Sequence, residues 1–491
     1  MPVTFRKHLP IAASFLAVAG LASSAIGQAK PAETKTIELT LTPRSAPDPV
    51  LRYRLLPLES ERTPGDAVPI YLRLSCETKD EATQQINANS SKWLDSPIGE
   101  FPVAEARKFV NQFPGKLKQM EYGARRQTAN WNYTLPEEKE HAIEILLPDA
   151  QELRAWTRLL AIKARVEIAE KKYDEAIRTI ETGLSMSRHL AEGPFLINSL
   201  VGIAGATQFL NRLEELITQP DAPNLYWALT ALPRPLIGIR KQMETEQTMM
   251  EGLLPEINDL DAPRTDAEWT SRLARLHGRW NGLAKLMDIP TEAMQSPNAP
   301  HVAPAVPVKP SSNVDRDFAK FQSETLPEAR AFAKAHGVSI EGLSDAHVIM
   351  LYIGGQYREI RDRSFAPSYL PYPDAVPLYA AVDAKNKSVK GPIPTLFAAF
   401  APALVNAESA QVRLDRRVAI LRVIEALRLQ AAASNGTLPK SLDAVNVAPI
   451  PLDPATGRAF DLRRDGDAVV LNVPGIPAGH PNVSYRISLR K

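Results

Sequence analysis

The sequence predicts a mainly α-helical protein, an irregular multi-helix body with small β elements at its N- and C-terminal ends. Between residue 63 and about residue 290, and again between residues 327 and 434, apolar residues recur with a period of about 3.6 residues, which is typical of helices. Segments near both ends of the 491-residue chain instead alternate apolar and polar residues, as half-buried strands do.

The first 27 residues have the pattern of a secretory signal peptide. A positively charged N-terminal region (Arg6 and Lys7) precedes a short apolar run, and small residues follow this run up to Gly27. An uncleaved membrane anchor is the alternative, but a span needs about 20 consecutive apolar residues, and this run is shorter and contains a proline. We therefore expect cleavage after Gly27 and a periplasmic or extracellular location.

Composition excludes several classes of protein. The chain has 58 Lys and Arg against 56 Asp and Glu, and loss of Arg6 and Lys7 with the signal would make the counts equal. This balance predicts no binding to nucleic acid. Cys76 is the only cysteine, so an internal disulfide and a lipoprotein anchor are both excluded. The apolar segment 195–210 is too short for a membrane span, and none is expected after signal cleavage.

Two alternating segments, residues 36–42 and 51–55, predict two strands separated by a proline-rich turn. The helical period begins at residue 63 and is interrupted by proline or glycine. Breaks are expected at Pro97, Pro114, Pro136, Pro148, Gly193, Pro220 and Pro233.

An αα-hairpin is predicted between residues 149 and 190. One face of each helix is apolar, and Lys171 and Lys172 form the corner between them. A third helix follows from Pro194, and its Gly202 and Gly205 predict close approach of a neighbouring backbone. The apolar faces comprise Leu153, Trp156, Leu160, Ala164 and Ile168 in the first helix, and Tyr173, Ala176, Ile177, Ile180 and Leu184 in the second.

Residues 170–177 resemble the turn and second helix of a tetratricopeptide repeat. The resemblance covers about 35 residues, one repeat length, and departs from the pattern at Lys163, where the repeat has a large apolar residue. Because arrays need about three repeats and the sequence shows one, the resemblance implies only a packed helix pair.

Most of the mature chain is similar to a group of exported bacterial proteins of unassigned function. The similarity is carried by residues 53–57, 164–183, 188–194 and 369–373. It implies export and a helical fold, and it brings no activity or ligand.

A proline- and alanine-rich tract at residues 293–313 predicts a linker. The predicted domains are therefore residues 28–292, with the first strands and a helical domain, and residues 314–491, a helical region that ends in a β-hairpin. The second part is expected to contain helices at residues 327–336, 345–361 and 404–434, with Ser344 and Gly436 as caps. A hairpin around Gly466 and a last strand at residues 483–489 follow.

Residues 436–443 and 451–457 resemble the end of major pseudopilins, although the N-terminal processing motif of that family is absent. We interpret the resemblance as a local helix–turn–hairpin shape. It also makes Asp453 a candidate calcium ligand, with few other oxygen ligands in view.

The sequence contains no catalytic or cofactor motif: its eight histidines are scattered, and no zinc, nucleophile-elbow or phosphate-loop pattern is present. We predict no cofactor and no metal, and the catalytic residues, if any, are unknown. Two weaker candidates are the acidic pair Glu244 and Glu246 and a proline-stiffened segment whose tyrosines could line a ligand or partner groove. Those tyrosines are Tyr369, Tyr372 and Tyr379.

The leading hypothesis is a non-catalytic exported scaffold or protein-binding protein whose partner is another exported protein. The alternative is a periplasmic hydrolase or sugar-acting enzyme whose carboxylates meet only in the fold. A shallow apolar groove would favour the scaffold, and a deep pocket with acidic or histidine side chains would favour the enzyme.

Processing of the N-terminus gives the first testable prediction. N-terminal sequencing or intact-mass measurement of the exported protein should give a mature chain that begins at or near Gln28, because small residues precede the peptide bond between Gly27 and Gln28. Recovery of an exported chain that retains Met1 would contradict the prediction.

Overall fold

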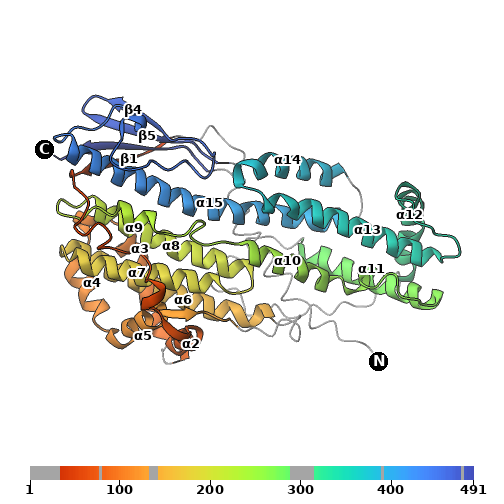
Figure 1. The fold of residues 1–491 in the computed structure, drawn as a ribbon. Coiled ribbons are helices and arrows are strands. Elements are labelled where there is room, and N and C mark those ends of the chain that lie inside the picture. The colour runs from red at the N-terminus through yellow and green to blue at the C-terminus, as the bar shows by residue number, and fades with distance from the viewer. Residues whose placement is uncertain are drawn as a thin grey trace. The chain divides into compact units, whose positions relative to one another are not determined.

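The computed structural model confirms a mainly α-helical fold with small β elements near the ends of the described chain (Figure 1). Fourteen α-helices and six strands lie within the described residues. The predicted signal peptide at residues 1–27 and the predicted linker at residues 293–313 lie outside them. The structure describes residues 34–76, 80–131, 142–287, 314–388, 392–476 and 480–490.

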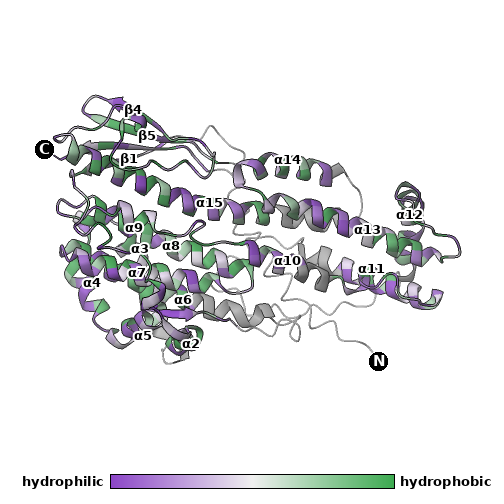
Figure 2. Ribbon diagram, viewed as in Figure 1, coloured by the Kyte–Doolittle hydropathy of each residue, from purple (hydrophilic) through white to green (hydrophobic). Residues whose placement is uncertain are grey.

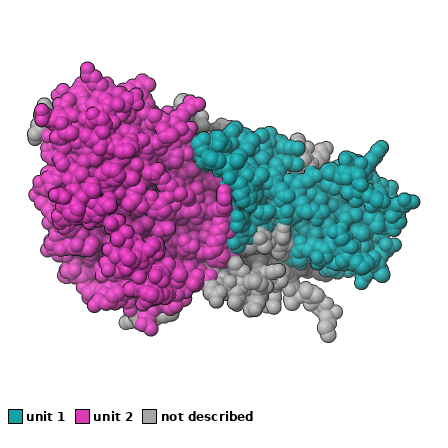
Figure 3. Space-filling view, in the orientation of Figure 1, with its two compact units in different colours: residues 1–24, 134–144, 243–405 teal, residues 25–133, 145–242, 406–491 magenta. Residues whose placement is uncertain are grey.

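The chain forms two compact units, shown in separate colours in Figure 3. Unit 2 comprises residues 25–133, 145–242 and 406–491, and the remaining residues form unit 1. This division differs from the predicted one at residues 293–313, because unit 2 contains segments from both halves of the sequence.

A four-stranded sheet explains why unit 2 joins distant parts of the chain. Strand β1 (Lys35–Leu41) pairs in parallel with β6 (Val483–Leu489), whose other edge pairs with β5 (Ala468–Val473). Strand β5 pairs in turn with β4 (Asp461–Asp465). The first predicted strand, the hairpin and the last strand are thus confirmed. An isolated hairpin is marginally stable, and the added strands supply the partners it needs.

Two predictions for the N-terminal region are wrong. Residues 51–55 form turns and irregular backbone rather than a strand. Two neighbouring side chains of this segment bind a helix instead of a strand: Tyr53 and Arg52 donate hydrogen bonds of 2.8 and 3.0 Å to the two carboxylate oxygens of Asp174, although Arg52 stays exposed. Residues 63–66 do not begin a helix but form β2 (Thr63–Asp66), which pairs in parallel with β3 (Arg126–Thr128).

The helices of unit 2 surround a core of apolar side chains. The sequence supplies stripes of such residues at helical spacing, and burying them is the main favourable term in folding. The helices are α2 (Val68–Cys76), α3 (Asp80–Asp95), α4 (Val103–Val110), α5 (Pro114–Ala124), α6 (Ala142–Ala169), α7 (Tyr173–Ala191), α8 (Leu196–Ile217) and α9 (Tyr226–Thr230), together with residues of α10 (Arg240–Leu253) and α15 (Pro392–Ala433).

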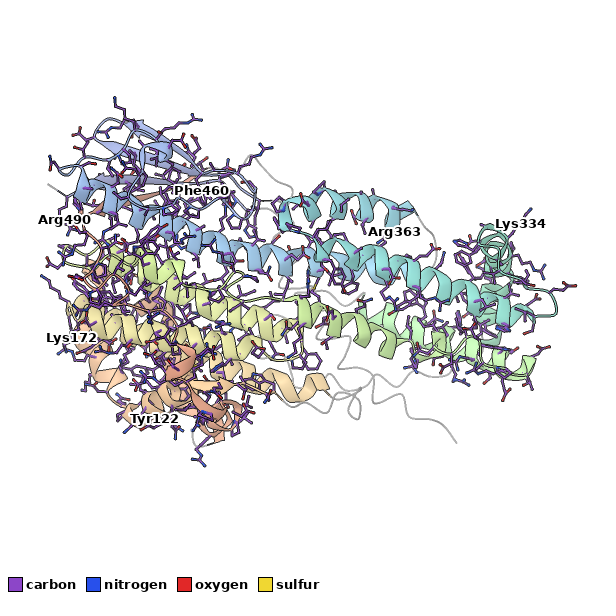
Figure 4. All side chains as sticks on the ribbon, in the orientation of Figure 1. Tyr122, Lys172, Lys334, Arg363, Phe460 and Arg490 are labelled. Carbon is purple, nitrogen blue, oxygen red and sulfur yellow. The ribbon has the colours of Figure 1, made fainter. Side chains whose placement is uncertain are left out.

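Helices α6 and α7 confirm the predicted αα-hairpin, and all ten residues predicted for its apolar faces are buried. At the corner Lys171 has a positive φ of 61°, and Lys172, labelled in Figure 4, follows it. Helix α6 begins at Ala142, so Pro148 lies within it and does not break it as predicted. Lys163 donates to Glu167 at 2.5 Å and to Thr179 of α7 at 2.7 Å, so it links the two helices through polar contacts.

The close approach predicted at the third helix, α8, is confirmed. A Cβ on Gly202 would lie 2.5 Å from the carbonyl oxygen of Ser187, and one on Gly205 would lie 2.7 Å from the Ser187 hydroxyl. Only glycine lets α7 and α8 pack this closely.

Helix α15 begins at Pro392, earlier than predicted, and ends as predicted before Gly436, which has a φ of +75°. Hydrophobic and hydrophilic residues alternate along α15 in Figure 2. Its predicted core residues Leu414, Val418, Leu421, Ile424 and Leu427 are all buried.

Two charged side chains in unit 2, Glu425 and Arg428, are fully buried and form an ion pair of 2.9 Å. Glu425 also accepts hydrogen bonds from the backbone of Leu225 and the side chain of Asn224. Arg428 donates further bonds to the carbonyl oxygens of Thr42, Ala222 and Pro223. The pair therefore connects three segments that are far apart in the sequence.

The remaining helices belong to unit 1. Ser344 caps one of them as predicted, its side chain accepting a hydrogen bond from the backbone nitrogen of His347. The indole of Trp269 stacks on the ring of His347, with centroids 3.9 Å apart. The helices are the rest of α10 and α15, α11 (Asp266–Met287), α12 (Val314–Ala335), α13 (Asp345–Phe365) and α14 (Tyr372–Ser388).

Removing one member of the buried ion pair should strongly destabilise unit 2. We expect Arg428→Met to lower the free energy of unfolding by about 3 to 5 kcal/mol, because Glu425 is left as an uncompensated buried charge. Urea denaturation measures this difference. Arg463→Met, which removes an exposed partner of Asp461, is the control and should change stability by less than about 1 kcal/mol. Equal effects of the two substitutions would contradict the prediction.

Candidate functional site

Unit 2 contains a cavity of about 770 Å³ whose wall is mostly polar. This volume lies in the range of about 300–1,000 Å³ that small-molecule sites occupy. Its lining comes from the β2 region, from β3 and the residues after it, from the C-terminal part of α7, and from the start of α10. The ionisable side chains among these residues are Arg62, Asp66, Arg188, His189, Glu192 and Lys241.

The end of α7 fixes one wall of the cavity. The last carbonyl groups of a helix have no partners within it, so they must be satisfied from elsewhere. Trp131 Nε1 donates to the carbonyl of His189 at 2.8 Å, and Lys241 Nζ donates to that of Glu192 at 3.2 Å. The side-chain amide of Gln242 donates to the carbonyl oxygens on either side of Glu192, those of Ala191 and Gly193. These bonds hold the segment after β3 and the start of α10 against the same helix end.

Asp66 fixes the opposite wall. Its Oδ1 accepts hydrogen bonds of 3.0 Å from the backbone nitrogens of Val68, at the start of α2, and Asn130. The carboxylate thereby joins the end of β2 to the segment that follows β3. Asp66 has a structural task in addition to lining the cavity.

His189 is buried and neutral at physiological pH. Burial, followed by the nearby charges of Arg62 and Arg188, lowers its pKa to about 4. Its Nδ1 lies 2.9 Å from the hydroxyl of Tyr71, whose pKa burial raises well above its usual value, so the phenol stays protonated and donates. The bond between the His189 ring and Tyr71 therefore holds α7 against α2.

Two guanidinium groups, those of Arg62 and Arg188, give the cavity its positive charge. Arg62 is paired with Glu59 at 3.0 Å, but the Glu59 side chain is 80% exposed. Within the described ranges, Arg188 has no hydrogen-bond or ion-pair partner. Burial and then the charge of Arg62 lower the pKa of Arg188, which nevertheless stays protonated.

The structure does not bring the predicted tyrosines together at an open surface. Tyr369, in the 3₁₀ helix η6 (Ala366–Tyr369), is 49% exposed, whereas Tyr372 and Tyr379 are 7% and 8% exposed. From Tyr372 the proline-stiffened segment forms α14 and includes Pro377 within that helix. Tyr372 and Tyr379 are therefore buried side chains, and Tyr369 is the only one of the three that is exposed.

The two members of the predicted acidic pair do not face the same way. Glu244 is exposed and Glu246 is buried, so the two carboxylates point to different sides of α10, as residues two apart on a helix do.

Asp453, the candidate calcium ligand, is the buried partner of an arginine. Its carboxylate lies 2.6 Å from Nη2 of Arg416, and its other oxygen accepts a hydrogen bond from the backbone of Ala455. Among the described residues, no group of three or more His, Cys, Asp or Glu side chains could hold a metal ion.

Comparison of the chain with protein-family models, with curated proteins and with solved structures found no match. No helix of the described chain is long and apolar enough to span a membrane.

Sequence reasoning missed the cavity, although one signal was available. Glu181, Ser185, Arg188 and Glu192 recur at spacings of three and four residues, beside the apolar stripe of α7. Such a polar stripe is typical of a solvated helix face. Here Ser185 is buried, and its hydroxyl has no hydrogen-bond partner within the part of the chain that the structure describes.

The titration of His189 gives a prediction about pH. The unfolded chain protonates this histidine near pH 6.5 and the folded chain only near pH 4, so stability should fall as the pH drops from about 7 to about 4. The difference contributes about 3 kcal/mol, the free energy that corresponds to this pKa shift. Urea denaturation at several pH values should show this contribution in the wild type and not in His189→Gln. Parallel pH profiles of the two proteins would contradict the assignment.

Proposed function

We propose that the protein is a non-catalytic exported binding protein that holds a small polar ligand in the cavity of unit 2. The observation that carries this proposal is a cavity of ligand size whose charged lining is held by hydrogen bonds from three separate segments. Rigid placement of binding groups lowers the entropic cost of holding a ligand.

The character of the cavity supports a small ligand over a docked protein. Protein-docking grooves are largely apolar at their centres, whereas this wall carries arginine, lysine, aspartate, glutamate, asparagine and glutamine side chains. The proposal keeps the binding function of the leading hypothesis and replaces the protein partner with a small molecule. The predicted signal peptide at residues 1–27 supports a ligand met in the periplasm or outside the cell.

The enzyme alternative has less support from the geometry. A hydrolase would need a carboxylate or histidine free to move a proton. Here His189 is buried and its Nδ1 is bonded to Tyr71, and Asp66 accepts two backbone hydrogen bonds. These groups support the wall and are poorly available for proton transfer.

A cavity-filling substitution tests the proposal. Gln127 is an exposed residue of β3 that lines the cavity, and Gln127→Trp should obstruct it without burying a charge. Saturation-transfer NMR with a mixture of anionic, cationic and uncharged polar compounds should identify ligands of the wild type, and Gln127→Trp should weaken their binding about tenfold or more.

The matched control is Gln85→Trp, on the exposed side of α3, which should bind like the wild type. Melting temperatures establish that both variants fold. Absence of any ligand for the wild type, or binding that persists in Gln127→Trp, would overturn the proposal.

A further inference from the structure

We infer that the ligand of this cavity carries a small oxyanion, a carboxylate or a phosphate group, bound between the guanidinium groups of Arg62 and Arg188. This inference rests on the proposed function and adds the chemical class of the ligand to it. It follows from the shared lining of the cavity by these two side chains, from the chemistry of the guanidinium group, and from the bonds that the other charged residues already make.

Two guanidinium groups of the lining lack a buried acceptor. The carboxylates of Glu192 and Glu59 lie near enough to Arg188 to raise its pKa, but neither forms a hydrogen bond with it among the described residues. Asp66 already accepts two backbone hydrogen bonds, and the only ion pair of Arg62 within the described residues is with the exposed Glu59. Arg188 has no hydrogen-bonded acceptor there. An anion would supply the missing acceptor oxygens.

Arginine is suited to this task because its planar guanidinium donates two parallel hydrogen bonds to a carboxylate or phosphate. Charge-assisted bonds of this kind are stronger than those between neutral groups. Two nearby guanidiniums also repel each other, and Arg62 contributes to the lowered pKa of Arg188. An oxyanion between them would remove this repulsion.

The negative end of the α7 dipole does not offset this preference. Helix C-termini attract cations because their last carbonyl groups are unpaired. At α7 the carbonyls of His189, Ala191 and Glu192 accept bonds from Trp131, Gln242 and Lys241. The protein's own donors therefore already bind these three carbonyl groups.

Arg188 is held close to its present position before any ligand binds. It is followed by His189, which Tyr71 and Trp131 hold through its ring and its carbonyl. These bonds restrict the backbone of Arg188, so less conformational entropy is lost when a ligand binds.

Isothermal titration calorimetry of the whole exported protein tests the inference with four probes: inorganic phosphate, succinate, glucose and choline. We expect binding of phosphate, succinate or both, and their relative affinities distinguish a phosphate site from a carboxylate site. Arg188→Gln should weaken anion binding about tenfold or more. Arg188→Lys keeps the positive charge but loses the planar guanidinium with its two parallel donors, so it should weaken binding less.

The matched control is Arg178→Gln, since Arg178 is an exposed arginine of the same helix that does not line the cavity. It should bind anions like the wild type. Circular dichroism melting curves check that each variant folds, and Arg62→Gln replaces Arg188→Gln if the latter does not.

The outcomes separate the two proposals. Binding of glucose or choline that Gln127→Trp abolishes, without anion binding, would overturn the oxyanion inference and leave the proposed function intact. Anion binding that Arg188→Gln and Arg62→Gln do not weaken would also overturn it. Absence of any binding that depends on Gln127 would overturn both.

Discussion

The buried ion pair between Glu425 and Arg428 is the interaction on which the architecture of unit 2 depends. A charge without solvent is costly unless every donor and acceptor finds a partner. Glu425 and Arg428 meet this condition only with the backbone around Asn224 and the carbonyl of Thr42, which follows β1. The C-terminal part of α15 is thereby connected to the loop before α9 and to the N-terminal strand. Displacing any of these segments would leave charged or polar groups buried without partners.

Other arginines of α15 extend the same principle toward the terminal sheet, which lies beside this part of the helix in Figure 1. Arg417 is 2.8 Å from Glu214 of α8 and also donates to the hydroxyl of Tyr485 in β6. Arg416 bonds Asp453 and the carbonyl of Pro474. Apolar burial supplies most of the stability, while these directed bonds determine which surfaces meet.

The cavity depends on a related constraint at the end of α7. Helix ends need partners for their carbonyl groups, and here those partners come from Trp131, Lys241 and Gln242. The segments that carry them cannot also fill the space beside Arg188 and Arg62. The bonds at the helix end thus help to shape a polar cavity lined by two arginines, in which a small anion could bind.

The sequence by itself determined the local structure of this protein. Apolar periodicity identified the α6–α7 hairpin and the core face of α15, Ser344 and Gly436 marked helix ends, and Gly202 and Gly205 indicated close packing, because each of these signals arises from neighbouring residues. The tertiary structure alone decided that β1 joins β6, that Tyr372 and Tyr379 are buried, and that Arg62, Arg188 and Lys241 line one cavity. Periodicity shows which face of an element is apolar but not which distant element covers it. Arg62 and Arg188 are separated by more than a hundred positions in the sequence, so only folding brings their charges together.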